Sequence, residues 1–191
     1  MDFFHPGEDF KLYTKMEHLW AFWRSHYIEN VDRIASSGCF LCEAVRQPPE
    51  KWRSYLLLHR GKNAFVIMNL YPYNAGHLMV CPIRHTDDFT SLSEEELLEI
   101  NKLVQASIKA LKETISPHGF NVGWNLGRVA GAGLESHIHC HIVPRWNGDT
   151  NFMPVLSGTK VISQHFLELY DKIKPNLDRV IEEMKLPKGE R

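Results

Sequence analysis

Three histidines, His137, His139 and His141, stand at alternate positions within the short segment 136–145. Successive side chains of a β-strand point to opposite faces, so this spacing predicts a strand with three imidazoles in a row on one face. Such a row is costly inside a core, because each desolvated ring needs hydrogen-bond partners. We therefore interpret the segment as a site for chemistry rather than as a polar strand face with satisfied histidines.

A histidine row of this kind suits nucleophilic catalysis at phosphorus. A neutral imidazole can attack a phosphoanhydride when a hydrogen-bond acceptor orients its other nitrogen, and flanking rings can donate to the phosphoryl oxygens. His139 has a histidine on each side and is the best-supported nucleophile. Gly131 and Gly133 precede the row, where missing Cβ atoms would let the backbone approach a ligand closely.

Length and composition bound the class of protein. A chain of 191 residues suits one domain with extensions, which can bury about 70% of its unfolded surface. The formal net charge of −1 gives no support for nucleic-acid or membrane binding. The N-terminal residues do not resemble a targeting signal, and no apolar run approaches the roughly 18 residues of a spanning helix. We expect a cytoplasmic protein whose four cysteines are thiols or metal ligands.

The pattern of the whole chain predicts an α+β fold with about five mostly antiparallel strands. Before the histidine strand, apolar runs predict four others: 55–59, 64–69, 77–82 and 120–125. Ser93 and Glu96 form a capping-box pattern, and apolar residues follow at helical spacing as far as Ile115. This long helix is expected to pack its apolar stripe on the sheet.

We expect three parts: an N-terminal helical extension at 1–52, a core domain at 53–158, and a C-terminal helical extension of that domain at 159–191. Apolar residues recur at helical spacing over 11–32, which predicts an amphipathic helix there. Two helical segments are predicted near the C-terminus, separated at Pro175: 161–172 and 177–184.

The run His137-Ile-His-Cys-His-Ile-Val143 resembles the signature of the histidine-triad (HIT) superfamily of nucleotide hydrolases and transferases. The flanking segments 117–123 and 143–152 are similar to its diadenosine tetraphosphate phosphorylase-like branch. The resemblance covers roughly residues 55–158 and implies a HIT-like fold and a homodimer. It also implies that His139 forms a nucleotidyl-histidine intermediate, and that His141 hydrogen-bonds the transferred phosphoryl group.

The same resemblance assigns Asn69, His77 and Asn125 to the binding of the substrate. Asn69 lies eight residues before His77, as in the HIT loop where an Asn or Asp binds ribose hydroxyls and a Gly-His pair opens the next strand. An amide can bridge two vicinal hydroxyls, whereas an Asn considered alone would more often serve the turn. Asn125 matches the amide that approaches the transferred phosphate in the family.

One departure from the family pattern precedes the triad. Many HIT hydrolases have Gly-Gln-Ser or Gly-Gln-Thr there, whereas this chain has Gly133-Leu134-Glu135-Ser136. The glutamine contact with phosphate is therefore absent. We expect backbone N–H groups near Gly133 and Ser136 to replace it.

Cys39 and Cys42 form a Cys-x-x-Cys pair, which suits tetrahedral zinc if two more ligands come from elsewhere, and equally suits two unligated thiols. Many HIT relatives complete the pair with a histidine after the Gly-His strand and with the first histidine of the triad. The matching residues are His85 and His137. The resemblance thus implies a structural Zn²⁺ site. His137 is counted among the catalytic residues as the first member of the triad, but as a zinc ligand it could not act as a free acid or base.

The resemblance implies cleavage of diadenosine polyphosphates by double displacement, with a purine nucleotide as substrate and phosphate or water as second nucleophile. Phosphate would convert diadenosine tetraphosphate to ADP and ATP. No magnesium ligand set is visible, so any Mg²⁺ would be carried by the substrate. Alternatives are an adenosine phosphoramidate hydrolase, a nucleotidylyltransferase, a nucleotide-binding signalling module, and a metal store built on the histidine row.

Overall fold

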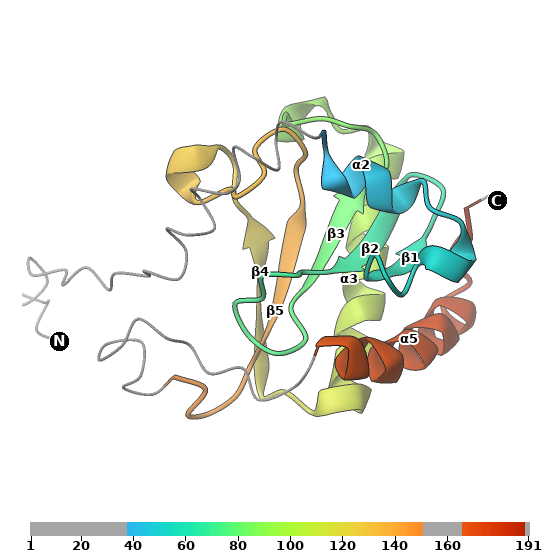
Figure 1. Cartoon of the computed structure of the whole chain (residues 1–191), viewed down its shortest axis with the longest axis vertical. Coiled ribbons are helices and arrows are strands. Elements are labelled where there is room, and N and C mark those ends of the chain that lie inside the picture. The colour runs from blue at the N-terminus through green and yellow to red at the C-terminus, as the bar shows by residue number, and fades with distance from the viewer. Residues whose placement is uncertain (1–37, 151–165, 190–191) are drawn as a thin grey trace, which may run out of the picture.

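The computed structural model describes residues 38–150 and 166–189. They form an antiparallel five-stranded sheet in the order β1-β2-β3-β5-β4 (Figure 1). The strands are β1 Leu57–Arg60, β2 Ala64–Met68, β3 Leu78–Pro82, β4 Gly119–Trp124 and β5 Cys140–Arg145. The predicted α+β fold is confirmed. The helix predicted at 11–32 and the start of the one predicted at 161–172 lie outside the described residues.

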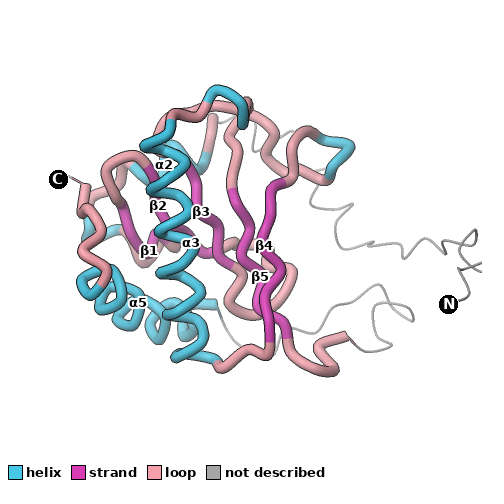
Figure 2. Tube along the Cα trace, turned by 180° about the vertical axis from the view of Figure 1, so that it is seen from behind, coloured by secondary structure: helices cyan, strands magenta, loops and turns pink. Residues whose placement is uncertain are grey.

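Helices cover the sheet unequally. The helices are α2 Phe40–Val45, α3 Glu94–Ile115 and α5 Phe166–Glu183, with short 3₁₀ turns at Pro49–Lys51 (η2), Phe89–Ser91 (η3) and Arg128–Ala130 (η4). Figure 2 shows α3 lying across one face of the sheet, where it packs on β2, β3 and β5. The short helix α2 contacts β1, and α5 packs on α3 and β1. Within the described residues, no helix is both long enough and apolar enough to cross a membrane.

The capping box predicted at the start of α3 is present. The Glu96 backbone N–H donates to Ser93 Oγ at 3.2 Å, and the Ser93 N–H donates to Glu96 Oε2 at 2.8 Å. These bonds satisfy two of the N–H groups that a helix start leaves unpaired. The helix then buries one stripe against the sheet through residues such as Ile100, Leu103 and Leu111.

The prediction of a break at Pro175 is wrong, because α5 continues through this residue. Proline removes one helical hydrogen bond, which costs stability in a helix interior. Burial of Ile173, Leu177 and Ile181 on both sides of the proline offsets that cost. The helix is further joined to β1, since the Tyr170 hydroxyl donates to the Leu57 carbonyl at 2.8 Å.

The central pair β3 and β5 brings distant segments together. These strands are antiparallel, with Leu78 opposite Ile142 and Met79 opposite His141. The loop that precedes β3 therefore lies beside the end of the region of β5 that pairs with β3, at Ile142, and the loop that follows β3 lies beside the residues preceding β5. The two loops around β3 thus reach different histidines.

Candidate active site and metal centre

The three triad histidines are buried, with exposed fractions of 0% for His137 and 7% for His139 and His141. Only His141 lies within β5, since the strand begins at Cys140. The sequence analysis placed all three on one strand, and this part of the prediction is wrong. The ladder with β3 ends where Cys140 pairs with Val80, so the preceding histidines need other backbone partners.

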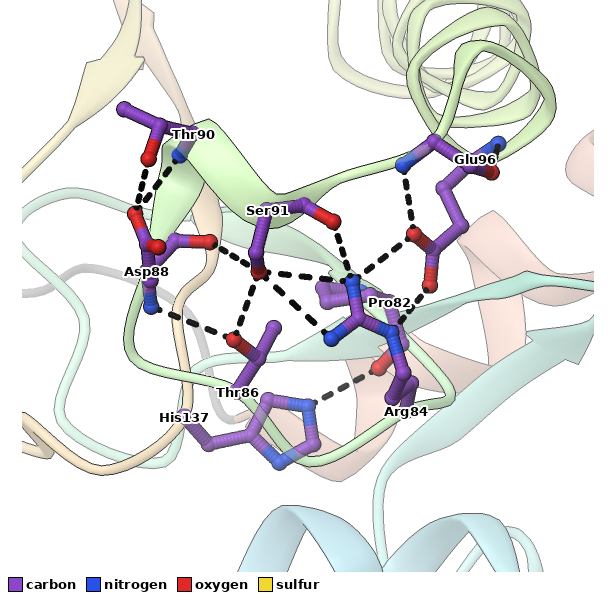
Figure 3. Close-up of polar contacts among 9 residues, drawn as sticks. Pro82, Arg84, Thr86, Asp88, Thr90, Ser91, Glu96 and His137 are labelled. Carbon is purple, nitrogen blue, oxygen red and sulfur yellow. Dashed lines mark hydrogen bonds and ion pairs between the residues drawn. The ribbon is translucent and has the colours of Figure 1, made fainter.

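The last residue of β3 and the loop after it supply partners for this segment. The Ile138 N–H donates to the Thr86 carbonyl at 2.8 Å, and His137 Nε2 donates to the Pro82 carbonyl, also at 2.8 Å. Figure 3 shows the His137 ring against Pro82. The segment before β5 is thereby held at two adjacent residues, although it is not part of the strand.

The geometry of His139 fixes its tautomer. Its Nδ1 lies 2.9 Å from the His137 carbonyl oxygen, which can only accept, so Nδ1 carries the proton. Burial lowers the pKa of His139 from its ordinary value of 6.5 and favours the neutral ring at pH 7. A neutral imidazole protonated at Nδ1 has its lone pair at Nε2, which is the form that a nucleophile requires.

His77 and His141 form a second ordered pair. The Tyr73 N–H donates to His77 Nδ1 at 3.0 Å, so a neutral His77 carries its proton at Nε2. That Nε2 donates to His141 Nδ1, also at 3.0 Å. A neutral His141 therefore presents Nε2–H, and the Asn125 amide lies 3.2 Å from this atom. Asn125 can accept from His141 Nε2–H only if its side-chain amide is flipped so that Oδ1 takes the place of Nδ2, because two N–H groups cannot bond to each other.

Asn69 belongs to the same group of side chains. Its Oδ1 accepts from the Tyr71 N–H at 2.9 Å, which is the turn chemistry expected of an Asn at this position. Its Nδ2 also lies 3.3 Å from His77 Nδ1. The structure thus brings the predicted residues Asn69, His77, His141 and Asn125 together.

The sequence analysis missed Tyr73, whose ring lies against both imidazoles. Its centroid is 4.6 Å from that of His77 and 5.5 Å from that of His141. Its place in the loop just before the Gly-His pair was the available signal. Gly133 and Ser136 lie between η4 and β5, and Ser136 is exposed, so their predicted contacts with phosphate stay predictions.

The four predicted metal ligands converge. One ligand atom from each of Cys39, Cys42, His85 and His137 lies within 4.8 Å of the others. His137 Nδ1 is 3.3 Å from Cys39 Sγ and 3.4 Å from Cys42 Sγ, while His85 Nδ1 is 3.2 Å from Cys42 Sγ. Tetrahedral zinc, with bonds of about 2.3 Å to sulfur and about 2.0 Å to nitrogen, places its ligands roughly 3.5 Å apart. The donor set and its spacing fit Zn²⁺.

Local structure explains this convergence. Cys39 is the N-cap of α2 and Cys42 lies in its first turn, so the two thiols are adjacent. His137 donates from Nε2 to the Pro82 carbonyl, which leaves Nδ1 as the ligating atom. Such an outer hydrogen bond commonly orients a metal-binding histidine.

Burial also sets the protonation of these ligands without metal. It lowers the pKa of His137 to about 4, so the ring is neutral at pH 7 and ready to ligate. Burial, followed by the neighbouring Cys39 thiol, raises the pKa of Cys42 to about 11. Since zinc binds the thiolate, metal binding must release the proton of Cys42.

A polar network supports the loop that carries His85. The Arg84 guanidinium donates to both oxygens of Glu96 at 3.0 Å and to the Ser91 carbonyl at 2.9 Å (Figure 3). Asp88 caps the start of the 3₁₀ turn η3, which ends at Ser91, by accepting from the Thr90 N–H. The arginine lowers the pKa of Glu96, which stays ionised and keeps the pair intact at neutral pH. The loop is therefore attached to the start of α3.

Comparisons with known proteins identify one family. Residues 56–148 match the model of the HIT domain. Over 153 residues the chain is 39% identical to the protein of Mycobacterium tuberculosis named AP-4-A phosphorylase, a match covering 78% of each chain. It is 30% identical over 112 residues to an uncharacterized HIT-like protein of Methanocaldococcus jannaschii, covering 58% of this chain and 81% of that one. The chain belongs to the HIT family.

Solved structures show the same fold. A zinc-bound histidine triad family protein from Mycobacterium smegmatis superposes with a TM-score of 0.60 at 24% identity, over 78% of this chain and 99% of that one. A hypothetical histidine triad nucleotide-binding protein from Sulfolobus tokodaii gives a TM-score of 0.58 at 25% identity, over 77% and 94%. The HIT-like fold predicted from the sequence is confirmed.

Proposed function

We propose that this HIT protein is a phosphorylase that cleaves diadenosine tetraphosphate to ADP and ATP through a nucleotidyl-histidine intermediate. The observation that carries the proposal is the state of His139, which is buried, neutral and protonated at Nδ1. Its remaining nitrogen, Nε2, is then a nucleophile at neutral pH. The 39% identity to the mycobacterial AP-4-A phosphorylase supports this choice of substrate.

The reaction balances in two displacements. His139 Nε2 attacks the phosphorus that carries one adenosine, the bond to the bridging oxygen breaks, and ATP leaves. An oxygen of inorganic phosphate then attacks the same phosphorus, the phosphorus–nitrogen bond breaks, and ADP leaves with His139 restored. The modified ring is cationic, and the His137 carbonyl that accepts from Nδ1 stabilises this charge.

Neighbouring side chains would orient the substrate. His141 is proposed to donate from Nε2 to a phosphoryl oxygen, with Asn125 beside it. Asn69 is proposed to bind ribose hydroxyls, with the backbone near Gly133 and Ser136 contacting phosphate. His77 is fully buried behind His141, so we assign it to orienting that ring, in place of the substrate contact expected from the sequence.

We propose that Zn²⁺ binds Cys39, Cys42, His85 and His137 as a structural ion. Four protein ligands complete a tetrahedral shell and leave no position for water or substrate. The ion would fasten α2 to the loop after β3 and to the segment before β5. It would supply no chemistry to the reaction, and Mg²⁺ would enter only with the polyphosphate substrate.

We also propose a homodimer formed through β4. This strand pairs only with β5 within the described residues, so its outer edge presents backbone groups for another strand. Val122 on β4 is 46% exposed, an apolar side chain that a second copy would cover. The mass of the protein in solution tests this expectation.

The test is a product assay with diadenosine tetraphosphate, with and without inorganic phosphate, on the wild type and His139→Asn. We expect ADP and ATP to appear only with phosphate, and His139→Asn to lower kcat by at least about 1,000-fold through loss of the nucleophile. A matched control is His118→Asn, at a histidine whose ring accepts from the Asn147 N–H.

AMP and ATP without phosphate would make the protein a hydrolase, and activity on an adenosine phosphoramidate alone would identify the alternative substrate. A fully active His139→Asn would exclude the proposed nucleophile.

A further inference from the structure

Asp149 is a buried carboxylate outside the histidine group, with its side chain only 9% exposed. Arg145 binds it with two hydrogen bonds, from Nε to Oδ2 at 2.6 Å and from Nη2 to Oδ1 at 2.9 Å. The Trp146 N–H and Asn74 Nδ2 also donate to Oδ2, at 3.2 and 2.8 Å. A carboxylate with these donors on both oxygens is held in one position.

Asn74 connects this carboxylate to the loop that precedes β3. It is 8% exposed, and its Nδ2 also donates to the Pro144 carbonyl on β5 at 3.0 Å. Both hydrogens of the amide are therefore used, one on the strand and one on Asp149. The loop of residues 69–77 is thus attached to a segment some 75 positions away in the sequence.

The attachment point lies next to the catalytic group. The His77 N–H donates to the Asn74 carbonyl at 3.2 Å and closes a tight turn around Gly76, whose φ is +73°. A Cβ at Gly76 would lie 2.7 Å from Ile115 Cδ1, so the turn also packs closely on α3. Asn74 and His77 are therefore the two ends of one closely packed turn, so the position of Asn74 constrains that of His77.

The loop and β5 therefore meet at two places. One is the Asn74 amide on Pro144 and Asp149, and the other is His77 Nε2 on His141 Nδ1. His141 and Pro144 are three residues apart on the same strand. With both contacts made, the His77 ring has one orientation, in which it directs the His141 Nε2–H into the site.

We propose that Asp149 is a positioning residue that acts through Asn74 to hold His77 against His141. Its kinetic consequence rests on the proposed function, whereas its structural consequence does not. Replacing the carboxylate by an amide leaves one acceptor oxygen where Arg145, the Trp146 N–H and Asn74 now share two, which weakens the bond to Asn74 and loosens the turn that carries His77. Asn69 directly follows β2 and keeps its own bond to the Tyr71 N–H, so nucleotide binding is affected less than transfer.

The test compares Asp149→Asn, Asn74→Ala and the double variant. We expect each single change to lower kcat by about tenfold to 100-fold and to leave KM within about threefold, because a small misplacement of a catalytic group slows chemistry more than binding. The double variant is expected to be no slower than the slower single variant, because both act through one contact. The matched control is Asp171→Asn, which breaks an exposed two-bond pair with Arg53. It should leave kcat unchanged.

A readout independent of turnover separates this inference from the proposed function. In ¹⁵N NMR of the histidine rings, wild-type His77 should appear as the Nε2–H tautomer and His141 as an Nδ1 acceptor. Asp149→Asn and Asn74→Ala should average these signals, while Asp171→Asn should retain them. Wild-type ring signals in both variants, additive losses of kcat, or a rise in KM alone would overturn the inference. An inactive wild type that shows the expected ring signals would instead reject the proposed function. If Asp149→Asn does not fold, Asn74→Ala carries the test.

Discussion

His137 and His141 belong to one three-histidine motif but have different surroundings. His137 turns Nδ1 toward the thiols of Cys39 and Cys42 and donates from Nε2 to a backbone carbonyl. His141 accepts from the His77 ring at Nδ1 and faces the Asn125 amide with Nε2. The first histidine thus lies among potential metal ligands, whereas the second lies between another imidazole and an amide, and contact with a phosphoryl group is its proposed role.

The antiparallel pairing of β3 and β5 accounts for the difference. The start of β3 lies near His141, so the loop before the strand supplies His77. The end of β3 lies near His137, so the strand's last residue supplies the Pro82 carbonyl and the loop after it supplies His85. His137 and His141 therefore belong to two different sites, because residues from opposite ends of β3 lie beside them.

Among the changes that test this comparison between His137 and His141, His141→Asn should have the largest effect. We expect kcat to fall by about 100-fold to 10,000-fold, because a donor aimed at the transferred phosphoryl group is lost. Zinc content, measured by elemental analysis, should stay unchanged, since His141 is not among the four converging ligands. Loss of the metal from this variant would favour a metal site built on the histidine row and remove the distinction between the two histidines.

The proposed metal site at His137 is tested by Cys42→Ser. Loss of one thiolate should release zinc and lower the free energy of unfolding by about 4 kcal/mol, if zinc binds the wild type with free metal about 1,000-fold above its Kd. Thermal unfolding with and without a chelator measures this. The chelator should destabilise the wild type and leave the variant unchanged. A variant with full zinc content and wild-type stability would contradict the assignment of Cys42 as a ligand.

Several features of the site could be predicted because they are local or carried by the family motif. The spacing of the triad, the Ser93 capping box and the Cys-x-x-Cys pair are all short-range patterns. Resemblance to the family added His85, which the structure places beside the thiols.

Other features could not be predicted because they depend on tertiary contacts. The beginning of β5 at Cys140 depends on where its ladder with β3 ends. The continuation of α5 through Pro175 depends on burial against the core. The bond between Asn74 and Asp149 joins residues 75 positions apart, and neither residue has a spacing that marks it.

The smallest expected effect is on zinc affinity, when the contacts of Arg84 that support the loop carrying His85 are removed. Arg84→Met removes the guanidinium that joins Glu96 to the Ser91 carbonyl, while His85 itself is retained. A matched change is Arg53→Met, which also removes two hydrogen bonds to a carboxylate. Here the carboxylate is that of Asp171 on α5, and both side chains are exposed. The two variants therefore differ in which segment they release.

We expect Arg84→Met to weaken zinc binding by about tenfold, the scale typical of lost outer-shell support, and Arg53→Met to leave it unchanged. Competition with a chromophoric chelator measures the affinity. With zinc saturating, kcat of Arg84→Met should remain within about twofold of the wild type, because the contacts of His77 with His141 do not involve this loop. A large loss of kcat in the zinc-saturated variant would show that the loop after β3 also controls the phosphoryl side. The loops before and after β3 would then both affect phosphoryl transfer. His137 and His141 would differ in their contacts but not in the function that those contacts support.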